Sequence, residues 1–264
     1  MAGVKHERDD SGNDVDAKAM RGQVDGRDDI LAMFTDYRTE LDEHHDRRER
    51  IVKASRDITA LSKKMVRDTP PHPLAPPILK ENTPRLSQIS DLFHSIAPDL
   101  QGPNAWRYQR QISPALQEYI EAISFSHYLT TQTLITYAEA QASIPAGILL
   151  SEEDYLLGLF DLTGEMMRFA INTIATGDRS QAIGDKERKR DVLSDLREIR
   201  VGFEGLDVGR SGHLKGQVDS KMGVMQTSVQ KVESAVYGMI IRGRERPAGW
   251  VPDTTERVVE VQSH

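Results

Sequence analysis

The 264-residue sequence contains no cysteine, which excludes disulfide scaffolds, thiolate metal sites and cysteine nucleophiles and fits an intracellular protein. It has no run of about 18 apolar residues, so no membrane-spanning helix is expected. The first thirty residues are charged throughout, and no signal peptide is expected there. The motifs GxxxxGK[ST], GxGxxG, GxSxG and HExxH are also absent. The common nucleotide-binding and hydrolase signatures are therefore missing.

Charge and hydropathy describe a soluble chain with a core and polar tails. The sequence has 34 basic and 41 acidic residues, a net charge of −7, and a hydrophobic fraction of 38%. The length suits one large domain or two small ones, since single cores stop growing near ~250–300 residues. A net acidic chain is not an obvious nucleic-acid binder, so such a role would need a local basic patch or a partner.

Apolar residues recur at helical spacing along most of the chain, whereas alternating strand patterns are scarce. The expected helices are 28–69, 85–96, 105–142, 152–176, 185–203 and 214–242. We therefore expect an all-α fold with a single domain of six or seven helices spanning 28–245. A proline-rich linker is expected at 69–84, a disordered acidic tail at 1–27 and a flexible tail at 246–264. A kink is expected near Pro114.

The helix expected at 152–176 is apolar around most of its circumference but carries one polar stripe. This stripe consists of Asp154, Gly158, Asp161, Glu165, Arg168 and Asn172. Asp161 and Glu165 are one turn apart, and two like charges on a buried face are unfavourable without a compensating cation or proton. A simpler interpretation is that Glu165 pairs with Arg168 and that Asp161 is exposed at a packing gap.

A second acidic pair, Glu118 and Glu121, lies on the stripe that continues into Phe125 and Tyr128. These aromatic residues are expected to face the interior and to draw both glutamates inward, although a solvated helix edge is the alternative. Two antiparallel helices would then bring four carboxylates together. Hard oxygen ligands suit Mg²⁺ or Mn²⁺, which can activate water and stabilise charge on a phosphoryl oxygen. A di-iron site is disfavoured, because the Glu-x-x-His pairs that it needs are missing.

Three clusters of basic residues interrupt the acidic background, and each alone is typical of a solvated helix face. The clusters are Arg47, Arg48, Arg50, Lys53 and Arg56, then Trp106, Arg107, Tyr108 and Arg110, then Lys186, Arg188, Lys189 and Arg190. The second cluster alternates aromatic and cationic side chains, a mixture that can stack bases and hold phosphates. Arg107, Tyr108 and Arg110 are therefore the candidate nucleic-acid-binding residues.

Four longer strings resemble one protein family. They are ELDEHHDRRERIVKASRDIT (Glu40–Thr59), LQEYIEAISF (Leu116–Phe125), DYLLGLFDLTGEMMRFAINTIATGD (Asp154–Asp178) and KVESAVYGMIIRG (Lys231–Gly243). Together they resemble the translin superfamily, and within it the factor X type of subunit. The similarity is spread from about residue 28 to residue 245.

The resemblance implies a translin-like helical bundle that assembles with translin-type subunits into a hollow, octameric barrel. It also implies a Mg²⁺-dependent endoribonuclease that cuts single-stranded RNA and is found in cytoplasm and nucleus. By the resemblance, Glu118, Glu121 and Asp161 match the catalytic, metal-binding acids of the factor X type, and Glu165 matches an acidic position of both subunit types. A non-catalytic scaffold subunit and a single-stranded DNA binder are the alternatives.

Overall fold

A computed structural model describes residues 13–68, 77–175, 191–209 and 212–245. The regular structure in these ranges consists of eight α-helices and one 3₁₀ helix, which confirms the expected all-α fold class. None of these helices combines the length and the apolar character that spanning a bilayer requires. The expected tail at 246–264 and the basic run at 186–190 lie outside the described residues.

By its internal contacts the chain divides into two compact units, Met1–Lys53 and Ala54–His264. The first helix, α1 (Asn13–Arg67), passes through both units. Apart from Ile51, every described buried apolar side chain belongs to the second unit. The described chain therefore has one helical core, as expected for a single domain.

In the first unit, α1 begins at Asn13, well before the expected start near residue 28. No proline precedes Pro70, so nothing in the sequence stops the helix from extending toward the N-terminus. The apolar stripe predicted on this helix is exposed here, at Ile30, Phe34 and Leu41 among others. In the second unit the equivalent stripe on α1 is buried at Ile58 and Met65.

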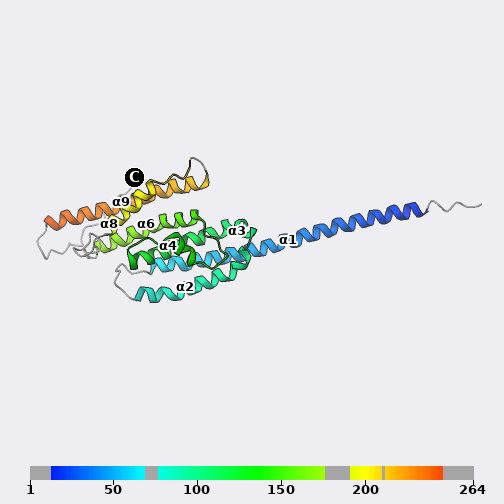
Figure 1. Cartoon of the computed structure of the whole chain (residues 1–264), viewed down its shortest axis with the longest axis horizontal. Coiled ribbons are helices and arrows are strands. Elements are labelled where there is room, and N and C mark those ends of the chain that lie inside the picture. The colour runs from blue at the N-terminus through cyan, green and yellow to red at the C-terminus, as the bar shows by residue number, and fades with distance from the viewer. Residues whose placement is uncertain (1–12, 69–76, 176–190, 210–211, 246–264) are drawn as a thin grey trace, which may run out of the picture. The chain divides into compact units, whose positions relative to one another are not determined.

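The remaining helices belong to the second unit (Figure 1). They are α2 (Pro77–Ile96), η1 (Ala97–Leu100), α3 (Pro103–Arg107), α4 (Gln109–Thr131), α5 (Tyr137–Ala142), α6 (Glu152–Ala175), α8 (Val192–Glu204) and α9 (His213–Glu245). The predicted helices at 152–176 and 214–242 match α6 and α9 closely.

The single helix expected at 105–142 is divided into three. Tyr108, at φ −107° and ψ 8°, separates α3 from α4. Gln132 ends α4 in the left-handed region at φ 56°, where its N–H donates to the carbonyl of Tyr128. Pro114 lies inside α4 without ending it. Helix α2 also contains a proline, since it begins at Pro77 and continues through Pro84. Residues 77–84 are therefore helical, although the sequence predicts that they belong to a linker.

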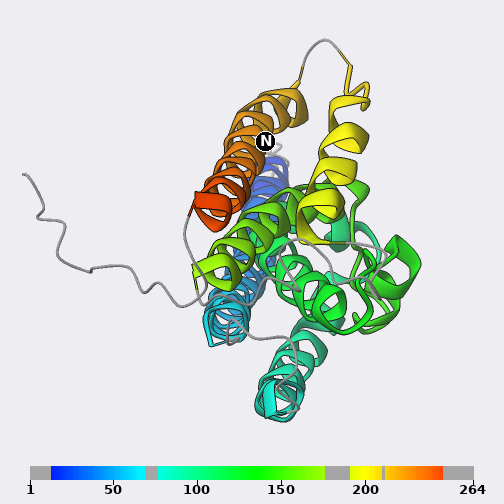
Figure 2. The same cartoon turned by 90° about the vertical axis from the view of Figure 1, so that its left-hand side faces the viewer.

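Helix α6 packs against α4 on one side and α9 on the other (Figures 1 and 2). Its core side chains include Leu157, Leu162 and Met166, which confirms that the most apolar predicted helix is buried. Helix α6 comes close to α4 at Gly158, where a Cβ atom would lie 2.8 Å from the carbonyl oxygen of Gln117. The absence of a side chain at this glycine lets the two backbones come together.

Asp154, on the polar stripe of α6, is buried and hydrogen-bonded, as expected for a residue that stabilises the fold. It is 2% exposed, and its carboxylate accepts hydrogen bonds from Gln109 Nε2 at 2.7 Å, Gln117 Nε2 at 2.9 Å and Ser151 Oγ at 2.7 Å. The hydroxyl of Ser113 donates to the same carboxylate. These neutral donors satisfy the buried carboxylate and connect the beginning of α6 to α4.

Candidate functional site

The structure brings the four sequence-predicted acids to one place in the second unit, with Glu118 and Glu121 on α4 and Asp161 and Glu165 on α6. The charges of Glu118, Asp161 and Glu165 each raise the pKa of Glu121, so these three acids lie within electrostatic reach of it. Phe125 and Tyr128 are buried, as the stripe on α4 predicts.

The expected antiparallel arrangement of these two helices is wrong. Residues near the start of α4, such as Gln109, contact Asp154 at the start of α6, and Phe125 further along α4 lies 6.3 Å from Phe169. The helices therefore run in the same direction. The connection between Gln132 and Ser151, which includes α5, carries the chain back to the starting end. The acids still converge, because Gly158 on α6 lies against Gln117 and Ile120 on α4, close in sequence to the acids of both helices.

Three cationic side chains neutralise three of the acids. Lys63 Nζ, on α1, lies 2.9 Å from Glu118 Oε1. Lys221, on α9, donates to Asp161 Oδ1. The simpler interpretation for Glu165 is confirmed in part, because Arg168 Nε donates to its Oε2 at 2.6 Å.

Arg168 also fastens α6 to α1, since its Nη2 donates to the carbonyl oxygen of Val66 at 2.9 Å. The pocket between these helices has a volume of about 380 Å³. It is lined by Lys63, Val66, Arg67, Glu118, Glu121, Glu165 and Arg168. Three acidic and three basic side chains therefore line one pocket.

Glu121 makes no ion pair or hydrogen bond with the described residues, unlike the other three acids. Burial, followed by the charges of Glu118, Asp161 and Glu165, raises its pKa from 4.5 to about 8. Lys221 partly offsets this effect. A carboxyl that is kept protonated in this way adds no negative charge to the site, so the three paired acids are balanced by their three cations.

The donor set is chemically suited to Mg²⁺, because it consists of carboxyl oxygens. Within the described residues, however, no three acidic or histidine side chains are already grouped as metal ligands. The ion pairs of Glu118 and Asp161 explain this, since each carboxylate is turned to its own lysine. Those two acids would exchange a lysine for the metal ion, and Glu121 would release its proton.

The raised pKa of Glu121 makes stability depend on pH. The unfolded chain releases this proton above about pH 4.5, whereas the folded chain keeps it until about pH 8. The folded state therefore binds more protons in this interval, and raising the pH favours unfolding. We expect wild type to lose about 3.5 kcal/mol more stability than Glu121→Gln between pH 5 and pH 8.

Urea unfolding of the metal-free protein, followed by circular dichroism at pH 5, 6.5 and 8, measures this difference. Glu43→Gln, at an exposed position of α1, is the matched control and should follow the wild-type pH dependence. Equal pH slopes for wild type and Glu121→Gln would contradict a protonated Glu121.

The predicted nucleic-acid-binding residues differ from one another in their exposure to solvent. Tyr108 is 4% exposed, so its ring belongs to the core and is not available to stack on a base, contrary to the expectation. Arg107 and Arg110 are exposed. Trp106 is 72% exposed, but the pocket that it lines also contains Glu152 and Glu153, which would repel phosphate.

Cations that the sequence did not single out are better placed to hold phosphate. Lys63 and Arg67 are one turn apart on α1 and line the pocket of the acids. Lys221 comes to the same acids from a helix far along the chain. The i,i+4 spacing of Lys63 and Arg67 was the only sequence signal, and it is too common to identify a site.

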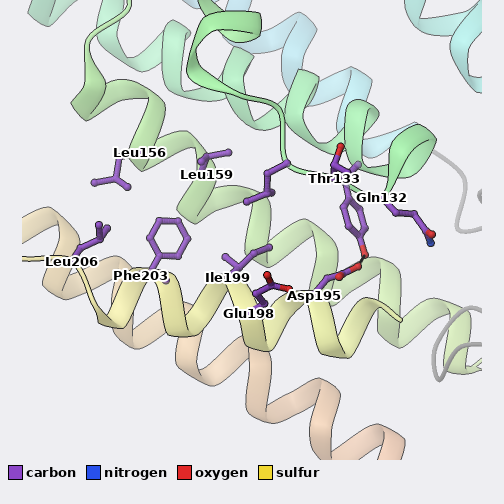
Figure 3. Close-up of a pocket in the computed structure, with 12 residues that line it drawn as sticks. Gln132, Thr133, Leu156, Leu159, Asp195, Glu198, Ile199, Phe203 and Leu206 are labelled. Carbon is purple, nitrogen blue, oxygen red and sulfur yellow. Dashed lines mark hydrogen bonds between the residues drawn. The ribbon is translucent and has the colours of Figure 1, made fainter. Parts of the chain in front are cut away.

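A second, larger pocket shares no lining residue with the first. It has a volume of about 610 Å³ and lies between the end of α4, the beginning of α6 and α8 (Figure 3). Leu156, Leu159 and Phe203 give it a mainly apolar wall, and the buried Tyr128 hydroxyl donates to Asp195 Oδ2 at 2.9 Å. None of the sequence-predicted site residues contributes to it.

The helical core and the paired acids define an all-α protein with a carboxylate-rich, cation-balanced site. The model of the Translin family matches residues 46–243, and the chain belongs to that family. Translin-associated protein X of Rattus norvegicus is 31% identical over 251 residues, which cover 85% of this chain and 83% of the relative. The homologue of that protein in Schizosaccharomyces pombe is 30% identical and covers 81% of this chain and 89% of its own length.

Similarity to translin itself is shorter. Human translin is 30% identical over 145 residues, or 52% of this chain and 55% of translin. Among solved structures, apo-NeC3PO has a TM-score of 0.57 at 16% identity and covers 76% of this chain and 96% of its own. AfC3PO in complex with duplex RNA has a TM-score of 0.53 at 17% identity, with coverage of 81% and 99%. These structures support the fold.

Proposed function

We propose that this chain is the catalytic subunit of a Mg²⁺-dependent endoribonuclease that cuts single-stranded RNA in a hetero-oligomer with a translin-type subunit. The observation that carries the proposal is the convergence of Glu118, Glu121, Asp161 and Glu165, with Glu121 left without an ion pair among the described residues. A purely structural helix interface has no need of such a group, because desolvating an unpaired carboxyl is costly.

Glu118, Glu121 and Asp161 would hold the metal ion, and Glu165 would act as a further ligand or would orient the others. Bound there, Mg²⁺ would polarise a phosphate oxygen and lower the pKa of a water molecule that attacks the phosphorus. Glu165 already accepts a hydrogen bond from Arg168, which restricts its side chain. The acids thus supply the negative ligands, and their own hydrogen bonds supply part of the orientation.

The cations would bind the substrate. Lys63 and Arg67 line the same pocket as the acids, and Lys63 is well exposed to solvent. A phosphodiester that enters this pocket meets these positive groups beside the acids, so its backbone is attracted to the site and positioned there. RNA binding is therefore expected to weaken as salt is raised.

The relatives support a partner and an RNA ligand. The name Translin-associated protein X describes association with translin, and AfC3PO has been solved with duplex RNA. We infer that this chain likewise assembles with a translin-type subunit and binds RNA. Preference for single strands is part of the proposal and rests on the family resemblance.

A non-catalytic subunit that binds RNA or single-stranded DNA is the second candidate. It is favoured by the three ion pairs, which satisfy all the acids except Glu121 without a metal ion. Such a subunit would bind nucleic acid equally well in EDTA and would give no product.

Cleavage of a labelled single-stranded RNA by the chain co-purified with a translin-type partner separates these candidates. The reaction is run with Mg²⁺, with EDTA, and with Mg²⁺ and the double variant Glu118→Gln, Glu121→Gln. We expect products only for wild type with Mg²⁺, while all three samples bind RNA. Binding without products in every sample would replace the nuclease with the non-catalytic subunit.

A further inference from the structure

Lys221 reaches the acid site from α9, 60 residues away from the carboxylate that it contacts. Its ammonium donates to Asp161 Oδ1 on α6. Val218 and Met225, on either side of it along α9, are 2% and 0% exposed. Packing of α9 against α6 therefore fixes the position of the ammonium, and the side chain is only 26% exposed.

Lys221 joins α9 to α6, since its ammonium comes from one helix and its carboxylate partner lies on the other. Lys63 and Arg168, the other cations here, pair with Glu118 and Glu165 respectively. Lys221 thus contacts a carboxylate, Asp161, that the proposed divalent ion would also contact.

A second lysine of α9, Lys215, forms an ion pair within the helix and serves as a comparison. Lys215 Nζ lies 2.7 Å from Asp219 Oδ2, one turn further along α9, and the two side chains are 37% and 60% exposed. That pair involves no carboxylate of the site and needs no second helix. The contact between Lys221 and Asp161 differs in both respects, since it joins two helices and occupies a candidate metal ligand.

We propose that Lys221 is a positioning residue that neutralises Asp161 in the metal-free protein and competes with Mg²⁺ for that carboxylate. The inference rests on the proposed function, because it takes Glu118, Glu121 and Asp161 as the metal ligands. When Mg²⁺ binds, the ammonium leaves Asp161. The metal affinity of the site is then set in part by a residue of α9.

Metal binding without RNA tests this inference on the full chain assembled with a translin-type partner. Free Mn²⁺ is measured by electron paramagnetic resonance, and Mg²⁺ binding by calorimetry. We expect Lys221→Met and Lys221→Gln to bind either ion about tenfold more tightly than wild type, because the competing cation is gone. Lys221→Arg, which keeps the charge, and Lys215→Met, the matched control, should bind as wild type does.

A second measurement uses the wild-type protein alone, so it does not depend on the folding of any variant. Acetic anhydride labelling followed by mass spectrometry compares lysine reactivity with and without saturating Mg²⁺. We expect Mg²⁺ to increase labelling of Lys221 several-fold, because its ammonium is released, and to leave Lys215 unchanged.

Unchanged or weaker metal binding by Lys221→Met and Lys221→Gln, or unchanged labelling of Lys221, overturns the inference. In one such case, wild type binds metal while the double variant Glu118→Gln, Glu121→Gln does not. The metal site of the proposed function then stands, and only the role of Lys221 fails. If wild type binds no metal at all, both proposals fail together.

Discussion

Asp161→Asn should reduce RNA cleavage by the assembled complex by about 10²–10³-fold, while RNA binding is kept. The substitution hardly changes side-chain volume, but it removes one negative ligand of the proposed metal ion and the counter-charge of Lys221. Effects of this size are typical when one group that stabilises charge in the transition state is lost. Single-turnover cleavage of a labelled single-stranded RNA at saturating protein measures the chemical step directly.

Asp219→Asn is the matched control. Asp219 is also an aspartate paired with a lysine of α9, Lys215, but it lies on the exposed face of that helix. Its substitution should leave cleavage within about twofold of wild type, since exposed pairs contribute little. Cleavage by Asp161→Asn at the rate of Asp219→Asn would remove Asp161 from the catalytic site.

Gly158→Ala should destabilise the protein by about 2.5 kcal/mol and impair cleavage as well. The new Cβ would lie 2.8 Å from both the carbonyl oxygen of Gln117 and the Cβ atom of Ile120, so α4 and α6 must move apart. Gln117 directly precedes Glu118, and Gly158 is one turn before Asp161. Separation of the helices therefore also shifts the two acidic pairs relative to each other.

Gly164→Ala tests whether the effect belongs to the helix contact or to glycine replacement in general. Gly164 is on the same helix, and a Cβ atom there meets nothing within 4 Å. Alanine should stabilise the protein at this position by about 0.5–1 kcal/mol, because it favours the helix and restricts the unfolded chain. Equal free energies of unfolding for the two variants, from urea titrations, would contradict close packing at Gly158.

Much of the fold was predictable from apolar periodicity. Helices α6 and α9 follow their predicted ranges, and the residues expected to face the core, such as Phe125 and Tyr128, are buried. Glu118, Glu121, Asp161 and Glu165 were predictable as a group, because the family resemblance and the inward-facing stripes pointed to the same residues.

Other features depend on tertiary geometry that periodicity does not contain. The break at Tyr108 and the left-handed turn at Gln132 are single-residue backbone events, and neither position is a glycine or proline. The direction of α4 relative to α6 depends on the path of the connecting segment. The roles of Lys63 and Lys221 depend on which faces of α1 and α9 meet the acids, and a lysine on a helix surface gives no sign of this.

The most direct test of the acid site as a metal centre is the anomalous diffraction of Mn²⁺ in crystals of this chain with a translin-type partner. We expect an anomalous peak among the carboxylates of Glu118, Glu121 and Asp161, and no such peak in crystals of the Glu118→Gln, Glu121→Gln variant. Absence of the peak at saturating Mn²⁺, with Lys63 and Lys221 still bound to their carboxylates, would contradict metal-dependent catalysis at this site.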